Sequence, residues 1–269
     1  MKERALITGA SAGIGLAFAR KLASEGYNLV LVARRKNRLE EIKKELEDSY
    51  SVEVQIIQGD LTKEEDRKHI YQETLEKGKD IHLVVNNAGI GSIHRFHQSP
   101  WEINQRMIQL NISAVTEIAH TFLQPMVQRK SGAMIIVAST ASFQPIPYFT
   151  VYGATKAYDY FLAMGLYQEL KKDGVHVMAL CPGPTITEFG GEEMDIRRMA
   201  GFLAFTADRV VEICWKGYKK RKKAVVPGFF NSLGIFVQRF LPASLVLWIN
   251  AKIFERVYQK TLKERNKLE

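Results

Sequence analysis

Short apolar runs alternate with amphipathic stretches along the first 228 residues of the chain. Runs rich in Val, Ile and Leu predict strands at residues 4–8, 28–33, 52–57, 82–85, 133–138, 175–181 and 224–226. Several of these runs show little alternation between apolar and polar positions, which is typical of strands buried on both faces. Helical spacing of apolar residues predicts helices at 13–25, 36–48, 63–77, 100–128, 150–172 and 208–219.

Regular alternation of strands and helices predicts an α/β fold. Parallel strands need crossover connections, and these place helices on both faces of the sheet. We therefore expect one doubly wound parallel sheet of about seven strands. Two regions interrupt the alternation. Residues 187–206 follow the sixth strand and are expected to form a lid at the carboxyl edge, where open α/β sheets bind ligands. Residues 1–228 are expected to form the catalytic domain, and residues 229–269 an amphipathic helical extension of the same domain.

The composition sets few further limits. The chain has 269 residues, of which 46% are hydrophobic and 25% charged, so it can bury a full core in one large domain. Cys181 and Cys214 stand far apart with no metal-binding spacing, so we expect buried thiols, a reducing compartment and no metal site. The first four residues lead directly into a predicted strand, so we expect no signal peptide. These features predict a cytoplasmic protein.

The formal net charge is +9, and much of the excess lies in residues 216–223 and in the C-terminal tail. We interpret the run as a solvated helix end, where cations suit the helix dipole. A nucleic-acid partner is not expected, because aromatic residues are not interleaved as a single-strand groove requires. Attraction to anionic lipids or anionic substrates remains open.

Tyr152 precedes Lys156 by four residues within a predicted helix. Residues spaced in this way lie on one face of a helix. A phenol has a pKa of about 10, and a fixed ammonium beside it lowers that pKa. The pair therefore suits a general acid/base. The same spacing also occurs by chance on solvated helix faces. Other motifs must therefore show whether this pair is catalytic.

A glycine-rich turn separates the first strand from the first helix. Gly9 permits a tight turn, and Gly13 and Gly15 let the backbone approach a pyrophosphate at the helix N-terminus. Together with Ser11 and Ile14, these glycines are the predicted phosphate-binding residues of a dinucleotide fold of the Rossmann type.

The end of the second strand indicates which dinucleotide binds. An acidic residue there suits the ribose 2′-hydroxyl of NAD, whereas this chain has Ala33 followed by Arg34 and Arg35. Guanidinium groups bind phosphate in a fork geometry, so we predict NADP(H) rather than NAD(H). The alternative is that both arginines simply begin a charged helix.

These motifs together resemble the short-chain dehydrogenase/reductase family, and the resemblance covers residues 1–228. The matching motifs include the glycine turn described above. The other matching residues are Asp60 after the third strand, Asn87, Ala88 and Gly89 after the fourth, Asn111, Ser139, Tyr152 with Lys156, Pro182 with Gly183, and Thr187. Their order and spacing fit the family throughout.

The resemblance implies a role for each of these residues. The adenine would be held by Asp60 and the Leu61 backbone. The cofactor ribose would lie close to the backbone of Asn87, Ala88 and Gly89. The nicotinamide carboxamide would be held by Pro182, Gly183 and Thr187. Tyr152 would exchange a proton with the substrate oxygen, Ser139 would polarise the carbonyl, and Lys156 would bind the ribose and lower the pKa of Tyr152. Asn111 would bend the fourth helix and hold a water that links Lys156 to solvent. Ser142 is a weaker candidate than Ser139 because its spacing to Tyr152 is wrong.

The predicted substrate is apolar. Aromatic residues near the strand ends, among them Phe143, Phe149 and Phe202, are expected to wall the pocket, which favours a hydrophobic carbonyl or alcohol. The chain also resembles 3-ketoacyl and hydroxysteroid reductases of this family, and that resemblance implies a ketone or 3-ketoacyl thioester. These side chains could instead belong to the core. The competing functional hypothesis is a catalytically silent NADP-binding sensor or scaffold on the same fold.

The C-terminal extension mixes aromatic, aliphatic and basic residues. It contains no run of ~18 apolar residues that would span a bilayer. Three interpretations stay open: an amphipathic helix on a membrane surface, a flap over the substrate cleft, or a contact in a homodimer or homotetramer.

Overall fold

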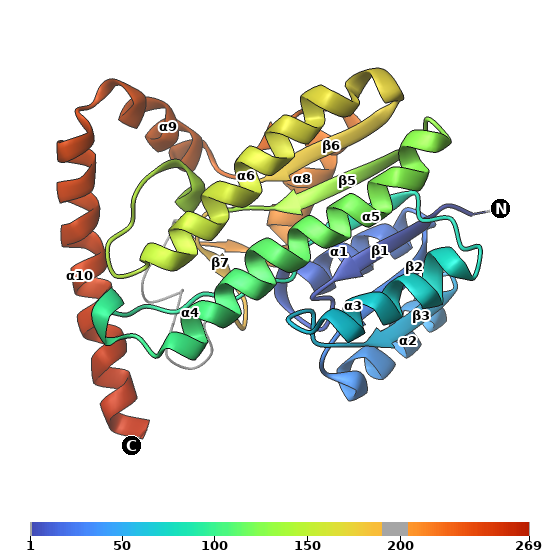
Figure 1. Ribbon diagram of the computed structural model, residues 1–269, viewed down its shortest axis with the longest axis horizontal. Helices are drawn as coiled ribbons and strands as arrows, with labels where there is room; N and C mark the ends of the chain where they lie inside the picture. Colours follow the sequence, from blue (N-terminus) through green and yellow to red (C-terminus); the bar gives the residue numbers. More distant parts are fainter. Residues whose placement is uncertain (1, 190–203, 269) are drawn as a thin grey trace.

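A seven-stranded parallel sheet forms the centre of the computed structural model, which describes residues 2–189 and 204–268 (Figure 1). The strand order is β3-β2-β1-β4-β5-β6-β9, and every neighbouring pair is parallel. The strands are β1 (Arg4–Thr8), β2 (Asn28–Ala33), β3 (Val54–Gln58), β4 (Leu83–Asn86), β5 (Gly132–Val137), β6 (Val175–Leu180) and β9 (Ala224–Val225). The predicted doubly wound α/β fold is confirmed.

Both faces of the sheet are buried, which explains the continuous apolar runs. In β1, Ala5 and Ile7 belong to one core cluster, whereas Leu6 belongs to the cluster on the opposite face. Because adjacent side chains of a strand point to opposite faces, a strand covered on both sides needs apolar residues at every position.

Helices cover the two faces in separate layers (Figure 1). Residues of α1 (Gly13–Ser24), α2 (Lys36–Ser49) and α8 (Ala207–Lys219) pack into the first core cluster. Residues of α3 (Glu64–Tyr71), α5 (Val115–Gln128) and α6 (Thr150–Leu170) pack into the second.

Two predicted helices are widened locally. The stretch predicted at 100–128 consists of α4 (Trp101–Ile108), a π-helical segment (Gln109–Ala114) and α5. The stretch predicted at 63–77 ends in a second π-helical segment (Gln72–Glu76). Segments of this kind are frequent at functional sites, and the first of them carries Asn111.

A small second sheet borders the predicted lid. The strand β7 (Thr185–Ile186) pairs in parallel with β8 (Phe205–Thr206), which joins the two ends of the segment at residues 187–206. Most of that segment, including Phe202, lies outside the described residues.

The C-terminal extension consists of α9 (Phe229–Val237), a 3-10 turn (Gln238–Phe240) and α10 (Ala243–Leu268). Figure 1 shows α10 standing across the end of the molecule toward which the strands point. In the described part of the chain, no helix is both long enough and apolar enough to cross a membrane.

Candidate active site

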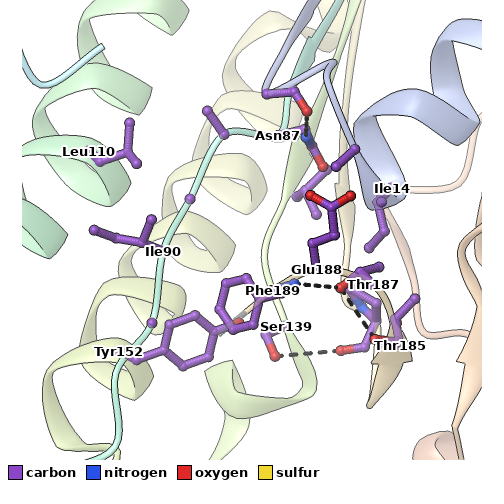
Figure 2. A pocket seen from close by; sticks show the side chains of 18 of the residues that line it. Ile14, Asn87, Ile90, Leu110, Ser139, Tyr152, Thr185, Thr187, Glu188 and Phe189 are labelled. Atoms are coloured by element: carbon purple, nitrogen blue, oxygen red, sulfur yellow. Dashed lines mark hydrogen bonds between the residues drawn. The ribbon is translucent and has the colours of Figure 1, made fainter. Parts of the chain in front are cut away.

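A cavity of about 740 Å³ opens at the carboxyl edge of the sheet (Figure 2). This volume suits a small-molecule or cofactor site. Its walls come from the turn after β1, from the ends of β2, β4, β5 and β6, and from α10. Most of the residues predicted for the site line it: Gly9, Ser11, Gly13, Ile14, Arg34, Arg35, Asp60, Leu61, Asn87, Ala88, Gly89, Ser139, Tyr152, Lys156, Pro182, Gly183 and Thr187.

The glycine turn presents backbone to the cavity. Gly9 and Gly13 have φ values of +66° and +55°, which favour glycine. Gly15 is absent from the cavity wall, and a Cβ there would lie 2.2 Å from the Gly9 carbonyl oxygen, so it allows helix and turn to pack. No side chain caps α1 at Ala12. The first N–H groups of the helix are therefore available to an anion.

Arg35 is fixed at one end of the cavity. Its Nε and Nη2 donate to Ser11 Oγ at 3.3 and 3.1 Å, and its Nη1 lies 2.7 Å from Glu188 Oε2. The other oxygen of Glu188 accepts from Arg38 Nη2 at 2.9 Å. Hydrogen bonding from Arg35 holds the pKa of Glu188 below its usual value. Two guanidinium groups thus bind one anion between them at this position.

Arg38 and Glu188 were not among the cofactor-binding residues predicted from the sequence, although Glu188 lies in the predicted lid. Arg38 lies one helical turn after Arg35, so helical periodicity could have suggested it. Glu188 is far away in the sequence, and no local pattern indicates the pairing. Arg35 also precedes the first residue of α2, so the alternative that the arginines begin a charged helix describes its backbone position correctly.

Asp60 and Asn87 are held by neighbouring groups. Asp60 Oδ1 accepts from the Thr62 N–H at 3.1 Å and from the Thr62 hydroxyl at 2.9 Å. Burial raises the pKa of Asp60, but these bonds together with the positive charges of Arg106 and Arg34 outweigh it and leave the pKa below its usual value. Asn87 Nδ2 donates to the Thr8 carbonyl at 2.8 Å, so this side chain ties β4 to the glycine turn.

Asn111 lies one layer behind the cavity wall. Its Oδ1 accepts from Ile90 N at 3.0 Å, and its Nδ2 donates to Ile90 O at 2.9 Å and to Thr155 Oγ1 at 3.0 Å. A Cβ on Gly89 would lie 3.3 Å from Asn111 Oδ1 and 3.4 Å from Lys156 Nζ. Asn111 therefore joins the π-helical segment to α6 next to Lys156.

Tyr152 and Ser139 face the same end of the cavity. The Tyr152 ring stacks on Phe149 at 4.2 Å between centroids and is tilted against Phe189 at 5.5 Å. Burial raises the pKa of Tyr152 more than Lys156 and a hydrogen bond with Ser139 lower it. Lys156 therefore lowers the pKa of Tyr152, as the resemblance implies, but the apolar surroundings of the phenol outweigh the ammonium and leave the pKa above its ordinary value.

Lys156 is paired with a carboxylate that the sequence analysis did not identify. Its Nζ donates to Asp159 Oδ2 at 2.9 Å and to Val137 O at 2.8 Å. Burial lowers the pKa of Lys156, but Asp159 raises it above its ordinary value. The i,i+3 spacing of the two residues on a helix was a usable signal. The positive charge that should act on Tyr152 is thus partly countered.

Ser142, the weaker alternative to Ser139, and Phe143, a predicted substrate residue, both have structural contacts. Ser142 Oγ donates to the Lys156 carbonyl at 2.6 Å and accepts from Ser139 N at 3.3 Å, so it orders the turn after β5. Phe143 is absent from the cavity wall; its ring contacts Tyr160 at 4.6 Å and packs against the core. Its assignment to the substrate is corrected, because the turn directs it toward α6.

The inner face of α10 contributes to the cavity. Phe254 and Val257 line it, Tyr258 stacks on Tyr148 at 5.1 Å, and Asn250 Nδ2 donates to Pro145 O at 3.1 Å. Of the three interpretations of the extension, contact with the cleft is observed. Because α10 is distant in sequence from the other cavity residues, no local sequence pattern indicates that it contacts the cavity.

Known proteins share both the sequence pattern and the fold. A family model described as short chain dehydrogenase matches residues 3–197. The human very-long-chain 3-oxoacyl-CoA reductase is 32% identical over 186 residues, covering 67% of this chain and 58% of that protein. The human inactive hydroxysteroid dehydrogenase-like protein 1 is 33% identical over 185 residues, covering 66% and 54%. The matched part thus spans just over half the length of these two relatives.

A solved structure resembles almost the whole chain. The short-chain dehydrogenase from Sphingobium yanoikuyae in complex with NADPH is 33% identical, with a TM-score of 0.81, and the match covers 88% of this chain and 94% of that one.

Proposed function

The chain belongs to the short-chain dehydrogenase/reductase family, and we propose that it interconverts an apolar ketone or 3-ketoacyl thioester and its secondary alcohol with NADP(H). One observation carries the proposal. A single cavity joins the glycine turn and Arg35 at one end to Ser139, Tyr152 and Lys156 at the other. A dinucleotide site and an acid/base pair are thereby brought into one compartment.

The residues present fit NADP(H). The uncapped N-terminus of α1 suits a pyrophosphate, and Arg35 and Arg38 already share the carboxylate of Glu188. Ala33 provides no acidic side chain to bind a ribose 2′-hydroxyl or repel a 2′-phosphate. When bound, the cofactor supplies or accepts the hydride, and the protein orients and polarises the reactants.

Tyr152 moves the proton in this proposal. In the direction of reduction its hydroxyl donates to the substrate oxygen, and the Ser139 hydroxyl donates a hydrogen bond to the same oxygen. A phenol with a raised pKa stays protonated at neutral pH and is ready to donate. Lys156 has three N–H bonds, of which two are used by Val137 and Asp159. The third is available for a ribose hydroxyl.

The cavity walls favour an apolar substrate. Phe149, Phe189, Phe254 and Val257 surround the end that holds Tyr152. Apolar walls with a few convergent polar groups are typical of sites for hydrophobic ligands. The name of the 3-oxoacyl-CoA reductase relative agrees with such a substrate.

The test is NADPH oxidation with a panel of bulky apolar ketones and short- and long-chain 3-oxoacyl thioesters. We expect turnover by the wild type and a loss of at least about a hundredfold in Tyr152→Phe, with NADPH affinity retained. Tyr160→Phe on the same helix removes an equivalent hydroxyl outside the cavity and should retain activity. Equal activity of Tyr152→Phe and wild type would exclude the mechanism.

A silent NADP-binding protein is the second candidate, since one relative is named inactive. It predicts tight NADPH binding without turnover of any carbonyl in the panel. Single-turnover measurements with enzyme in excess distinguish this outcome from slow product release.

A further inference from the structure

Large apolar side chains that face solvent are concentrated in one short segment. Among the described residues, sixteen large hydrophobic side chains are exposed, and twelve of them lie within residues 229–253. Single exposed apolar residues are normal on a soluble surface, whereas a contiguous group marks a site of interaction. The segment comprises α9, the 3-10 turn and the first part of α10.

The helix α9 is almost entirely apolar, yet none of its residues is buried. Phe229 is 74% exposed, Phe236 56% and Phe240, in the turn that follows, 73%. These positions are spaced seven and four residues apart, so they follow one side of a helical path. An apolar helix without any buried residue requires a cover that the described part of this chain does not supply.

The helix α10 has two distinct apolar faces. One face, with Asn250, Tyr258 and Thr261 buried, packs against the cavity region. The other carries Trp248, which is 60% exposed, together with the exposed residues Leu245, Ile249 and Ile253. The inner face accounts for the contact with the cleft, but the outer face stays unexplained by it.

Positive charge accompanies the exposed apolar residues. Residues 229–263 contain five Lys or Arg and one acidic residue, Glu255. Arg239 lies beside Phe240, and the exposed side chains of Lys252, Arg256 and Lys260 continue the outer side of α10. Apolar and basic residues on one surface suit the interface of an anionic bilayer, where apolar side chains enter the acyl region and basic side chains are attracted to the lipid headgroups.

We propose that α9 and the outer face of α10 form a docking surface for an anionic lipid bilayer. The two helices lie in the interface between headgroups and acyl chains, since no described helix can span. A second copy of the chain fits less well. A two-fold contact places the same patch on both sides and brings like charges together, whereas anionic lipids complement them.

Co-sedimentation of the full chain with lipid vesicles tests this proposal and requires no turnover. Vesicles of equal parts phosphatidylglycerol and phosphatidylcholine should bind the wild type, and pure phosphatidylcholine should bind it less. Phe236→Ser with Phe240→Ser should lower the partition coefficient about tenfold for each side chain removed from the interface. Lys252→Glu with Arg256→Glu should weaken binding to the anionic vesicles alone.

Two matched controls separate this surface from others. Phe96→Ser with Trp101→Ser removes two exposed aromatic side chains elsewhere and should leave binding unchanged. Lys220→Glu with Lys222→Glu reverses charge in the basic run before β9 and should have little effect. Circular dichroism confirms that each variant is folded, and Trp248→Ser serves if the double Phe variant is not.

Three results would overturn the proposal. The first is a wild type that does not sediment with anionic vesicles at any ratio. The second is binding that is lost in the Lys220 and Lys222 variant but retained in the α9 and α10 variants. The third is a dimer in light scattering that Phe236→Ser with Phe240→Ser dissociates, without vesicle binding; a second copy is then the occupant.

Discussion

The Lys156 ammonium lies 2.9 Å from a carboxylate oxygen of Asp159, three residues further along α6. Both side chains are buried, and the second oxygen of Asp159 has no hydrogen-bond partner among the described residues. A lone cation is costly to bury, and an ion pair reduces that cost only in part. The site therefore keeps a charged lysine beside Tyr152 by burying an acid with it.

This pair predicts an unusual pH dependence of stability. Burial raises the pKa of Asp159 from 3.8 to about 6, despite Lys156. The folded state then binds this proton more tightly than the unfolded chain, so the contribution favours folding below about pH 4 and is lost as the pH rises through about 6. The difference between the two pKa values corresponds to roughly 3 kcal/mol.

Asp159→Asn removes this titration. The difference in unfolding free energy between the variant and the wild type should rise by roughly 3 kcal/mol in favour of the variant from about pH 4 to about pH 7. Loss of the ion pair adds a cost that does not depend on the Asp159 titration. Urea unfolding at several pH values measures the difference. A difference that does not change with pH would contradict a raised pKa for Asp159.

Breaking the pair from the other side should be costly. Lys156→Met leaves the Asp159 carboxylate buried without a cation, which typically costs about 3–5 kcal/mol of unfolding free energy. Lys156→Met with Asp159→Leu should recover most of that loss while carbonyl reduction stays absent. Lys77→Met breaks an exposed pair with Glu73 and should cost less than about 1 kcal/mol. If the double variant is no more stable than Lys156→Met, the two charges are not coupled.

The sheet was predictable because each strand carries its own signal. A strand buried on both faces, such as β2, must be apolar at nearly every position, and its bounds match the prediction. Local widening at Gln109–Ala114 and the two-residue strands β7 and β8 have no such signal, because their hydrogen bonds depend on contacts made elsewhere in the fold.

The candidate site was predictable where its residues form local motifs. The glycine turn and the pair of Tyr152 and Lys156 are defined by spacing alone, and both line the cavity. Glu188 meets Arg35 across 153 residues of sequence, and Phe254 stacks near Phe149 from a distant part of the chain. Composition could therefore suggest an apolar or charged wall but not which residues pair there. Phe143 was predicted to line the cavity but packs against Tyr160 in the core, because an aromatic residue near a strand end can face either side.

The shared carboxylate at the cavity predicts how cofactor affinity responds to charge. Glu188 occupies guanidinium groups of Arg35 and Arg38 that a 2′-phosphate would need. Glu188→Gln removes this competing anion and should tighten NADPH binding several-fold, with little change for NADH. Arg35→Ala should weaken NADPH binding at least about tenfold and leave NADH affinity nearly unchanged.

Fluorescence titration of both nucleotides measures these affinities. Arg20→Ala provides the control, because Arg20 pairs with Glu45 on the surface and does not line the cavity. Preference for NADPH that persists in Arg35→Ala would show that another residue recognises the 2′-phosphate.

The inner face of α10 should determine which substrates fit. Phe254 lines the cavity and stacks near Phe149, with 6.2 Å between ring centroids. Phe254→Ala removes one aromatic wall, so kcat/KM for a compact ketone should fall about tenfold or more, while a ketone with an additional ring should lose less or gain. Ile253→Ala is the matched control, because its side chain is exposed on the outer face of the same helix. Steady-state kinetics on both ketones, with NADPH affinity measured in parallel, provide the comparison. Equal changes for the two ketones would mean that α10 stabilises the fold without selecting the substrate.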